Sequence, residues 1–231
     1  MEITPSRTVS RLGFWSALFA ALFSVSYVVA QVAEWLGLLG SAGGPESTST
    51  PLGLVVLLTP SLFLGTAFAI LMVSVHYYAP DDRKIWSHLG VVFATIYAVL
   101  ISINYYVQLT FVLPRLLDGT AESVRLQPFL FVPFDSFLYS VDLLGYSFMS
   151  LATLFAAFVF TGPGIERAVR LFLIANGLVL PFLALQIYYP PLIWIASVWA
   201  VTFPGATIAL AVLFRRAARA TPEATVTPVT G

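Results

Sequence analysis

Long runs of apolar residues alternate with short polar segments along most of the chain. Six of these runs are long enough for a helix to cross a hydrocarbon core of about 30 Å, which takes roughly 20 residues. Unpaired backbone groups cannot face lipid, and the runs lack the two-residue alternation of barrel strands. The pattern therefore predicts an all-α, polytopic bundle of six transmembrane helices. The predicted spans are residues 12–37, 52–79, 86–113, 136–161, 168–189 and 192–214.

Basic residues concentrate in alternate connections between these runs. Nine of the eleven Lys and Arg residues are Arg7, Arg11, Arg83, Lys84, Arg167, Arg170, Arg215, Arg216 and Arg219. The connections between them hold only Arg115 and Arg125. Cytoplasmic loops of membrane proteins carry an excess of Lys and Arg. The distribution predicts a multi-pass protein of the cell membrane with both termini in the cytoplasm.

The chain is predicted to form a single transmembrane domain over residues 12–214. A short cytoplasmic N-terminus, residues 1–11, precedes it. Residues 215–231 follow it as a cytoplasmic tail, which we expect to be disordered because its last part is rich in Thr and Pro. The outer loop 115–135 carries several phenylalanines between prolines. They predict an interfacial segment at headgroup level, and the alternative is a lid over a site. The residues concerned are Phe129, Phe131 and Phe134.

Composition agrees with a membrane protein and removes several classes of function. Hydrophobic residues make up 59% of the chain and charged residues 10%, against about 25% charged in soluble domains. A formal net charge of zero predicts no surface for nucleic acid. Without cysteine there is no disulfide or thiolate site. Lys84 lies in a connection, so no retinal-type Schiff base is expected, and His76 and His88 alone make a poor metal or haem site. We predict membrane lipid as a partner, and no cofactor or metal.

Polar side chains recur at spacings of three and four residues inside several apolar runs, which places them on single helix faces. With the predicted orientation they share the outer half of the bilayer. This asymmetry is the main functional signal in the sequence. The stripes are Ser24, Tyr27, Gln31 and Glu34; Tyr97, Asn104 and Gln108; and Asp135, Tyr139, Asp142, Tyr146 and Ser150, with Asn176 and Gln186 in the fifth span.

Asp142 is the most informative of these residues. A carboxylate inside a bilayer costs at least about 2–3 kcal/mol on insertion scales, so it is expected to face the bundle interior and to have a partner. No Lys or Arg lies at its predicted depth, so its expected partners are neutral side chains. Such surroundings favour a carboxyl group that carries a proton. For the amides, and for Glu34 close to the interface, the alternatives are packing between helices and contact with headgroups.

These observations predict an outward-opening polar and aromatic cavity around Asp142. The hypothesis is that the protein binds or transports a small amphipathic molecule there, in a process linked to protonation of Asp142. The residues predicted to bind the ligand are Gln31, Asn104, Gln108, Tyr139, Tyr146, Asn176 and Trp199.

Two other functions stay open at the level of sequence. Glu34 and Asp142 could be the acid and base of an intramembrane isomerase or cyclase that acts on a lipid or isoprenoid, provided that the two carboxyls converge. Small-residue spacings, Ala17 to Ala21 and Gly65 to Ala69, permit close helix approach. They are the faces on which a structural or assembly subunit would form a homo- or hetero-oligomer.

Two stretches, INYYVQLTFVLPRLL over residues 103–117 and SVDLLGYSFMSLATLFAAFVF over residues 140–160, carry a resemblance. They resemble the third and fourth helices of a group of uncharacterised prokaryotic polytopic membrane proteins, in which an INYxxQLT-like run precedes an acidic residue and an LGY-like run. The resemblance implies six helices and transfers no activity. The predicted architecture is also similar to that of the S-components of energy-coupling-factor transporters, by analogy of fold alone.

Overall fold

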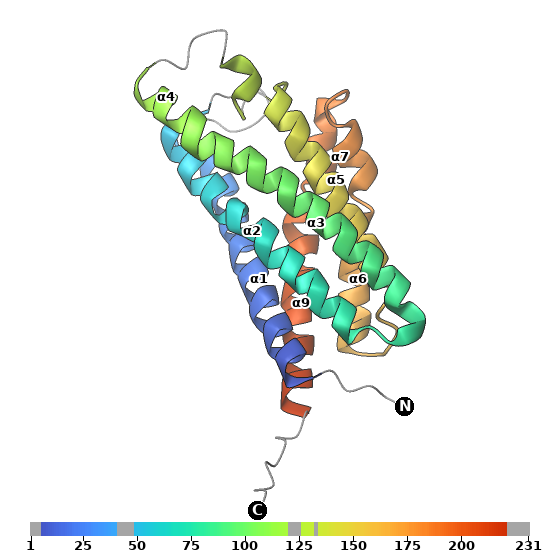
Figure 1. Ribbon diagram of the computed structural model, residues 1–231. Helices are drawn as coiled ribbons and strands as arrows, with labels where there is room; N and C mark the ends of the chain where they lie inside the picture. Colours follow the sequence, from blue (N-terminus) through green and yellow to red (C-terminus); the bar gives the residue numbers. More distant parts are fainter. Residues whose placement is uncertain (1–5, 41–48, 120–125, 132–133, 221–231) are drawn as a thin grey trace, which may run out of the picture.

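The computed structural model describes residues 6–40, 49–119, 126–131 and 134–220, and within these residues the regular secondary structure is helical. Six helical segments are long and apolar enough to cross a membrane. They lie side by side as one bundle (Figure 1). The predicted all-α polytopic bundle of six spans is thus confirmed, while its orientation in the membrane stays a prediction.

The spans differ in regularity. The first, second and fourth are single helices: α1 (Arg7–Trp35), α2 (Pro51–Tyr78) and α5 (Phe137–Ala157). The other three are composite. The third joins η1 (Asp81–Arg83), α3 (Lys84–Val107), the π-helix η2 (Gln108–Val112) and α4 (Leu113–Leu117); the fifth joins α6 (Ile165–Gly177) and α7 (Leu180–Leu185); and the sixth joins η4 (Pro190–Leu192), α8 (Ile193–Ala196) and α9 (Trp199–Ala220). A further 3₁₀ turn, η3 (Gln127–Phe129), precedes α5.

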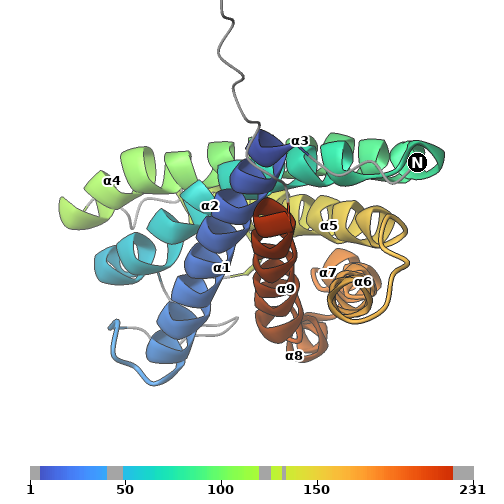
Figure 2. The same cartoon turned by 90° about the horizontal axis from the view of Figure 1, so that it is seen from below.

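The six spans form a closed ring. Going round it, α1 packs on α2, α2 on α3, α3 on α5, α5 on α6, α6 on α9, and α9 back on α1. An even number of spans brings the start of α1 and the end of α9 to the same end of the bundle (Figure 1). We call the opposite end the distal end. Seen from the end that holds the termini, α1 and α9 diverge as they run towards the distal end (Figure 2).

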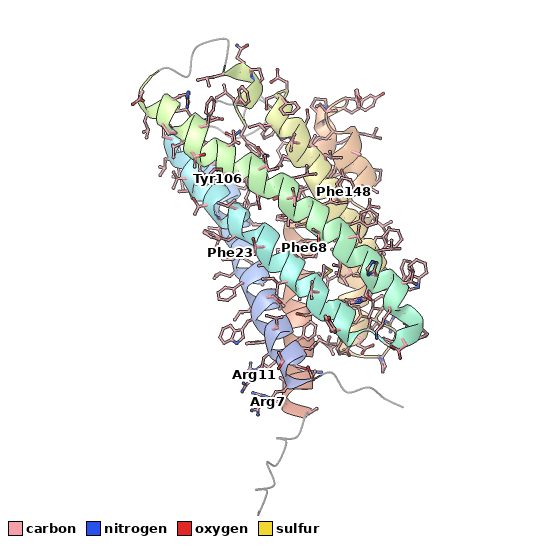
Figure 3. The ribbon with its side chains drawn as sticks, viewed as in Figure 1. Arg7, Arg11, Phe23, Phe68, Tyr106 and Phe148 are labelled. Carbon is pink, nitrogen blue, oxygen red and sulfur yellow. The ribbon has the colours of Figure 1, made fainter. Side chains whose placement is uncertain are left out.

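Aromatic packing holds the middle of the ring together. Phe68 is 1% exposed, and its ring contacts Tyr97 at 5.8 Å and Phe203 at 5.3 Å between centroids, both edge to face. Such pairs add about 0.5–1.5 kcal/mol to the burial of their area. The outer surface is also apolar: Tyr106, for example, points away from the bundle (Figure 3) and is 61% exposed. An apolar exterior around a packed interior is what a bilayer requires.

Proline acts differently at Pro60 and Pro204 than at Pro181. Pro60 and Pro204 lie within α2 and α9, which continue through them. Pro181, in contrast, belongs to the first turn of α7, directly after the break at Leu178 and Val179. Proline has no N–H and suits the first turn of a helix better than its interior. The fifth span is therefore two short helices whose faces are set separately.

Several glycines lie where helices approach most closely. A Cβ atom on Gly177 would lie 2.6 Å from Cβ and 3.0 Å from Cα of Leu154. Because one of these atoms belongs to the backbone of α5, the contact cannot be relieved by a side-chain rotation alone. Gly177 thus sets the distance between α5 and α6, and through them the frame of the distal end.

Replacing Gly177 by Val should destabilise the bundle by about 1–3 kcal/mol, the usual cost of overpacking a close contact. The measurement is thermal or denaturant-induced unfolding of the purified protein in detergent. The control is Leu178→Val at the neighbouring residue, which is 61% exposed and should change stability by no more than about 0.5 kcal/mol. Equal stability of the two variants would contradict the close packing described for Gly177.

The orientation is testable with single cysteines because the chain has none of its own. Asp118 and Asp82 are both exposed, on connections that the distribution of Lys and Arg assigns to opposite sides of the membrane. We expect a membrane-impermeant maleimide to label Asp118→Cys in intact cells and Asp82→Cys only after the membrane is opened. The reverse pattern would place both termini outside.

Candidate functional site

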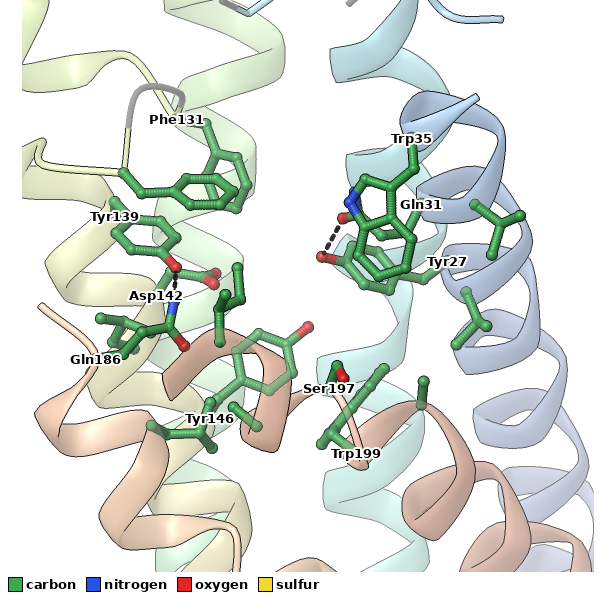
Figure 4. Close-up of a pocket in the computed structure, with 18 residues that line it drawn as sticks. Tyr27, Gln31, Trp35, Phe131, Tyr139, Asp142, Tyr146, Gln186, Ser197 and Trp199 are labelled. Carbon is green, nitrogen blue, oxygen red and sulfur yellow. Dashed lines mark hydrogen bonds between the residues drawn. The ribbon is translucent and has the colours of Figure 1, made fainter. Parts of the chain in front are cut away.

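A cavity of about 250 Å³ lies at the distal end, between α1 on one side and α5, α7, α8 and the start of α9 on the other (Figure 4). This volume is near the lower end of ligand pockets, which begin at about 300 Å³. Its walls are mainly apolar and aromatic. The aromatic residues in the lining are Tyr27, Trp35, Phe131, Phe134, Tyr139, Tyr146 and Trp199.

Asp142 contributes the carboxyl group of the lining. It lies on α5, whose first turn is capped by Ser136: the Ser136 hydroxyl accepts from the backbone N–H of Tyr139 at 3.0 Å. Asp142 is 6% exposed. Its Oδ1 accepts a hydrogen bond from Asn104 Nδ2 of α3 at 3.2 Å, and the Tyr105 hydroxyl also interacts with it. The partners of Asp142 are neutral side chains of α3, as the sequence predicted.

Aromatic side chains form the floor of the cavity below Asp142. Tyr146 follows Asp142 by one helical turn, and its hydroxyl lies 3.2 Å from that of Tyr105. The Tyr146 ring meets the edge of Trp199 at 5.4 Å. Trp199 in turn stacks on Phe203 at 5.4 Å, and its Nε1 donates to Met149 Sδ at 3.2 Å. The floor is therefore continuous with the packed core and is held rigidly by it.

The wall on α1 is a short hydrogen-bonded series of side chains. The Tyr27 hydroxyl donates to Gln31 Oε1 at 3.2 Å, and Gln31 Nε2 donates to Glu34 Oε2 at 3.1 Å. Tyr27 and Gln31 line the cavity, whereas Glu34 is buried behind them and does not. The two carboxyls that the enzyme hypothesis requires thus differ in position, since only Asp142 lines the cavity.

The segment before α5 supplies the wall at the far end. Phe134 stacks on Tyr139 with 4.4 Å between ring centroids, and Phe131 meets Tyr139 edge to face at 5.7 Å. Gln108 of the π-helix holds this segment because its amide donates to the backbone oxygen of Phe129. Two phenylalanines of the outer loop thus line the cavity, while residues 120–125 and 132–133 of that loop lie outside the described residues.

Five of the predicted site residues line the cavity, and four do not. Gln31, Tyr139, Asp142, Tyr146 and Trp199 belong to the lining. Among the others, Asn104 and Gln108 support it from behind, through Asp142 and Phe129, and Glu34 supports Gln31.

Asn176 lies elsewhere, in an interhelical hydrogen-bond network. Its Nδ2 donates to Thr153 Oγ1 of α5 at 3.0 Å, and its Oδ1 accepts from Thr202 Oγ1 of α9 at 3.2 Å. Asn176 is 0% exposed. It connects α5, α6 and α9, which is the packing role that polar side chains often have between membrane helices.

Sequence reasoning missed several members of the lining. Gln186 is ten residues from Asn176, a spacing that puts the two on different faces of a continuous helix, but the break before α7 resets the register. The Gln186 amide donates to the Tyr139 hydroxyl. Trp35, which has the typical position of an interface anchor, is 41% exposed at the rim, where its ring lies 5.8 Å from that of Trp194. Tyr27 and Gln186 carried a signal as polar residues inside the apolar runs, and Phe131 and Phe134 carried one as members of the outer loop.

The described residues contain no group of three or more His, Cys, Asp or Glu side chains that could hold a metal ion. At the end that holds the termini, His76 Nδ1 lies 2.9 Å from Ser87 Oγ, and the ring of His76 lies 5.7 Å from that of His88. This pair is remote from the cavity.

Comparison with protein-family models, with curated proteins and with solved structures gives no match for the chain.

Proposed function

We propose that this integral membrane protein binds a small amphipathic molecule in the distal cavity and moves it across or out of the membrane. The observation that carries the proposal is the position of Asp142, an almost fully buried carboxyl on the wall of a mainly apolar cavity. A carboxyl in this setting is costly and is expected to have a functional reason. The Asp142 carboxyl and the aromatic walls around it match a ligand with one polar end and an apolar body.

The proposal includes a proton carried by Asp142. Exchange of a ligand at a buried carboxyl changes the local charge, and the gain or loss of a proton compensates for such a change. The titratable groups that face Asp142 are hydroxyls: Tyr27 of α1, Tyr97 and Tyr105 of α3, and Tyr139 and Tyr146 of α5. Asp142 forms no ion pair with a described residue. Because Glu34 does not line the cavity, Asp142 is the carboxyl of the lining that is suited to proton exchange.

Binding is favoured over intramembrane acid/base catalysis by the arrangement of the two carboxyls. An isomerase or cyclase needs an acid and a base that both reach the substrate. Glu34 lies behind Gln31, to which it is hydrogen-bonded, and a substrate in the cavity would meet the amide first. A purely structural subunit would have no need of a cavity that contains a carboxyl.

The proposal is tested by identifying what the purified protein retains. The protein is isolated gently, analysed by native mass spectrometry, and extracted for lipids and metabolites. We expect the wild type to carry a specific small molecule, and Asp142→Asn to lose at least about 90% of it, because the substitution removes the charge while keeping the shape. That loss corresponds to about 1.4 kcal/mol or more of binding free energy.

Two further variants distinguish loss of binding at the cavity from a general effect of changing an acidic residue. Asp135→Asn makes the same chemical change at an exposed residue seven positions earlier and should retain the molecule. Ala200→Phe places a ring into the cavity with Asp142 intact and should release it. If wild type and Asp142→Asn both carry only bulk phospholipid, the proposal fails, and the polar stripes are packing between helices.

A further inference from the structure

The hydrogen-bond donors around the cavity are largely used within the protein. A donor that already has a good acceptor is not available to a ligand without loss of that bond. Tyr27 donates to Gln31, Gln31 to Glu34, Gln186 to Tyr139, Ser197 to the backbone oxygen of Trp194, and Trp199 to Met149. An anion would find only neutral donors here among the described residues of the lining.

Two acceptors remain towards the cavity. The Asp142 carboxyl and Gln186 Oε1 both face the open space (Figure 4), and Gln186 Oε1 accepts no hydrogen bond from a described residue. The donors left over are neutral: the proton of the Tyr139 hydroxyl, the second N–H of the Gln31 and Gln186 amides, and the indole N–H of Trp35 at the exposed rim. The one group of this set that can carry a charge is thus the Asp142 carboxyl.

The charge in the cavity is also unbalanced. Among the residues that the structure describes, its lining contains Asp142 and no Lys, Arg or His. A buried carboxylate needs an opposite charge nearby, and without one it is expected to hold a proton. A positively charged ligand group would provide that missing charge.

The aromatic rings point to the same kind of ligand. The faces of Tyr and Trp rings attract cations, and cages of such rings recognise quaternary ammonium groups. In this cavity Tyr146 and Trp199 form the floor beside Asp142, and Tyr27 meets Trp199 edge to face at 5.8 Å from the opposite helix. Apolar residues of α1 and α8, Val32 and Ile193 among them, border the rest of the space.

We infer that the ligand is a lipophilic organic cation, an amine or a quaternary ammonium compound whose charged group lies against Asp142 and whose apolar body lies along α1 and α8. This inference rests on the proposed function, since it assigns the chemical class of the ligand for the same cavity. A proton and such a cation would compete for one carboxylate, which gives the proton exchange a physical basis.

The test compares three probes of the same size that differ in charge: benzyltrimethylammonium, its neutral carbon isostere neopentylbenzene, and phenylmethanesulfonate. Binding to the protein in lipid nanodiscs is measured by equilibrium dialysis, with empty nanodiscs subtracted. We expect the cation to bind the wild type at least about tenfold more tightly than the neutral isostere, and the sulfonate to bind more weakly still. In Asp142→Asn the ratio of cation to isostere should fall to about one, while Asp142→Glu and Asp135→Asn keep a ratio above one.

The wild-type comparison decides the inference even if a variant does not fold. Equal or tighter binding of the isostere or the sulfonate overturns the cation as ligand and leaves the cavity as a binding site. If none of the three probes binds, the inference is overturned as well. A molecule recovered in the extraction experiment and absent from Asp142→Asn then shows that the proposed function still holds with a ligand of other chemistry.

Discussion

A carboxyl group buried in the membrane needs hydrogen-bond partners, and the arrangement of the distal end depends on this constraint. Asn104 provides one such partner for Asp142. Inside a bilayer no water is available to solvate a carboxyl, so its partners have to come from neighbouring helices. Here α3 brings both Asn104 and Tyr105 to the carboxyl of α5. Tyr105 then contacts Tyr146, whose ring forms part of the cavity floor. The acidic residue thus connects α3 and α5 at the distal end.

The same residue types serve two different purposes in this bundle, and the space around them makes the difference. Asn176, Thr153 and Thr202 satisfy one another where three helices meet, at 3.0–3.2 Å. This network holds helices together. At the distal end α1 and α9 diverge, so the polar groups of Asp142 and Gln186 border a cavity instead. A buried polar side chain alone therefore does not distinguish helix packing from a candidate site. The distinguishing feature is a cavity beside the polar side chain.

The number of spans and the central stripe of the site follow from sequence because they depend on local periodicity. Apolar length predicts each helix, and the spacing of Tyr139, Asp142 and Tyr146 puts all three on one face of a regular α-helix. The rest depends on irregular backbone that single-sequence patterns do not encode. The break before α7 turns Gln186 towards Tyr139, and the π-helix puts Gln108 against the backbone oxygen of Phe129. Asn176 lies outside the lining, in a network between helices, and sequence does not reveal this because a buried amide looks the same in sequence whether it faces a helix or a cavity.

The break in the fifth span also has a consequence for how one wall of the cavity is held. Backbone hydrogen bonds from α6 end with the N–H of Val179, and those of α7 start from the oxygen of the same residue. A six-residue helix is too short to be stable by itself, so the position of α7 depends on its packing against α5 and on the hydrogen bond from Gln186 to Tyr139. The wall that carries Gln186 is therefore anchored by side-chain contacts with α5, and the backbone of α6 contributes little to it.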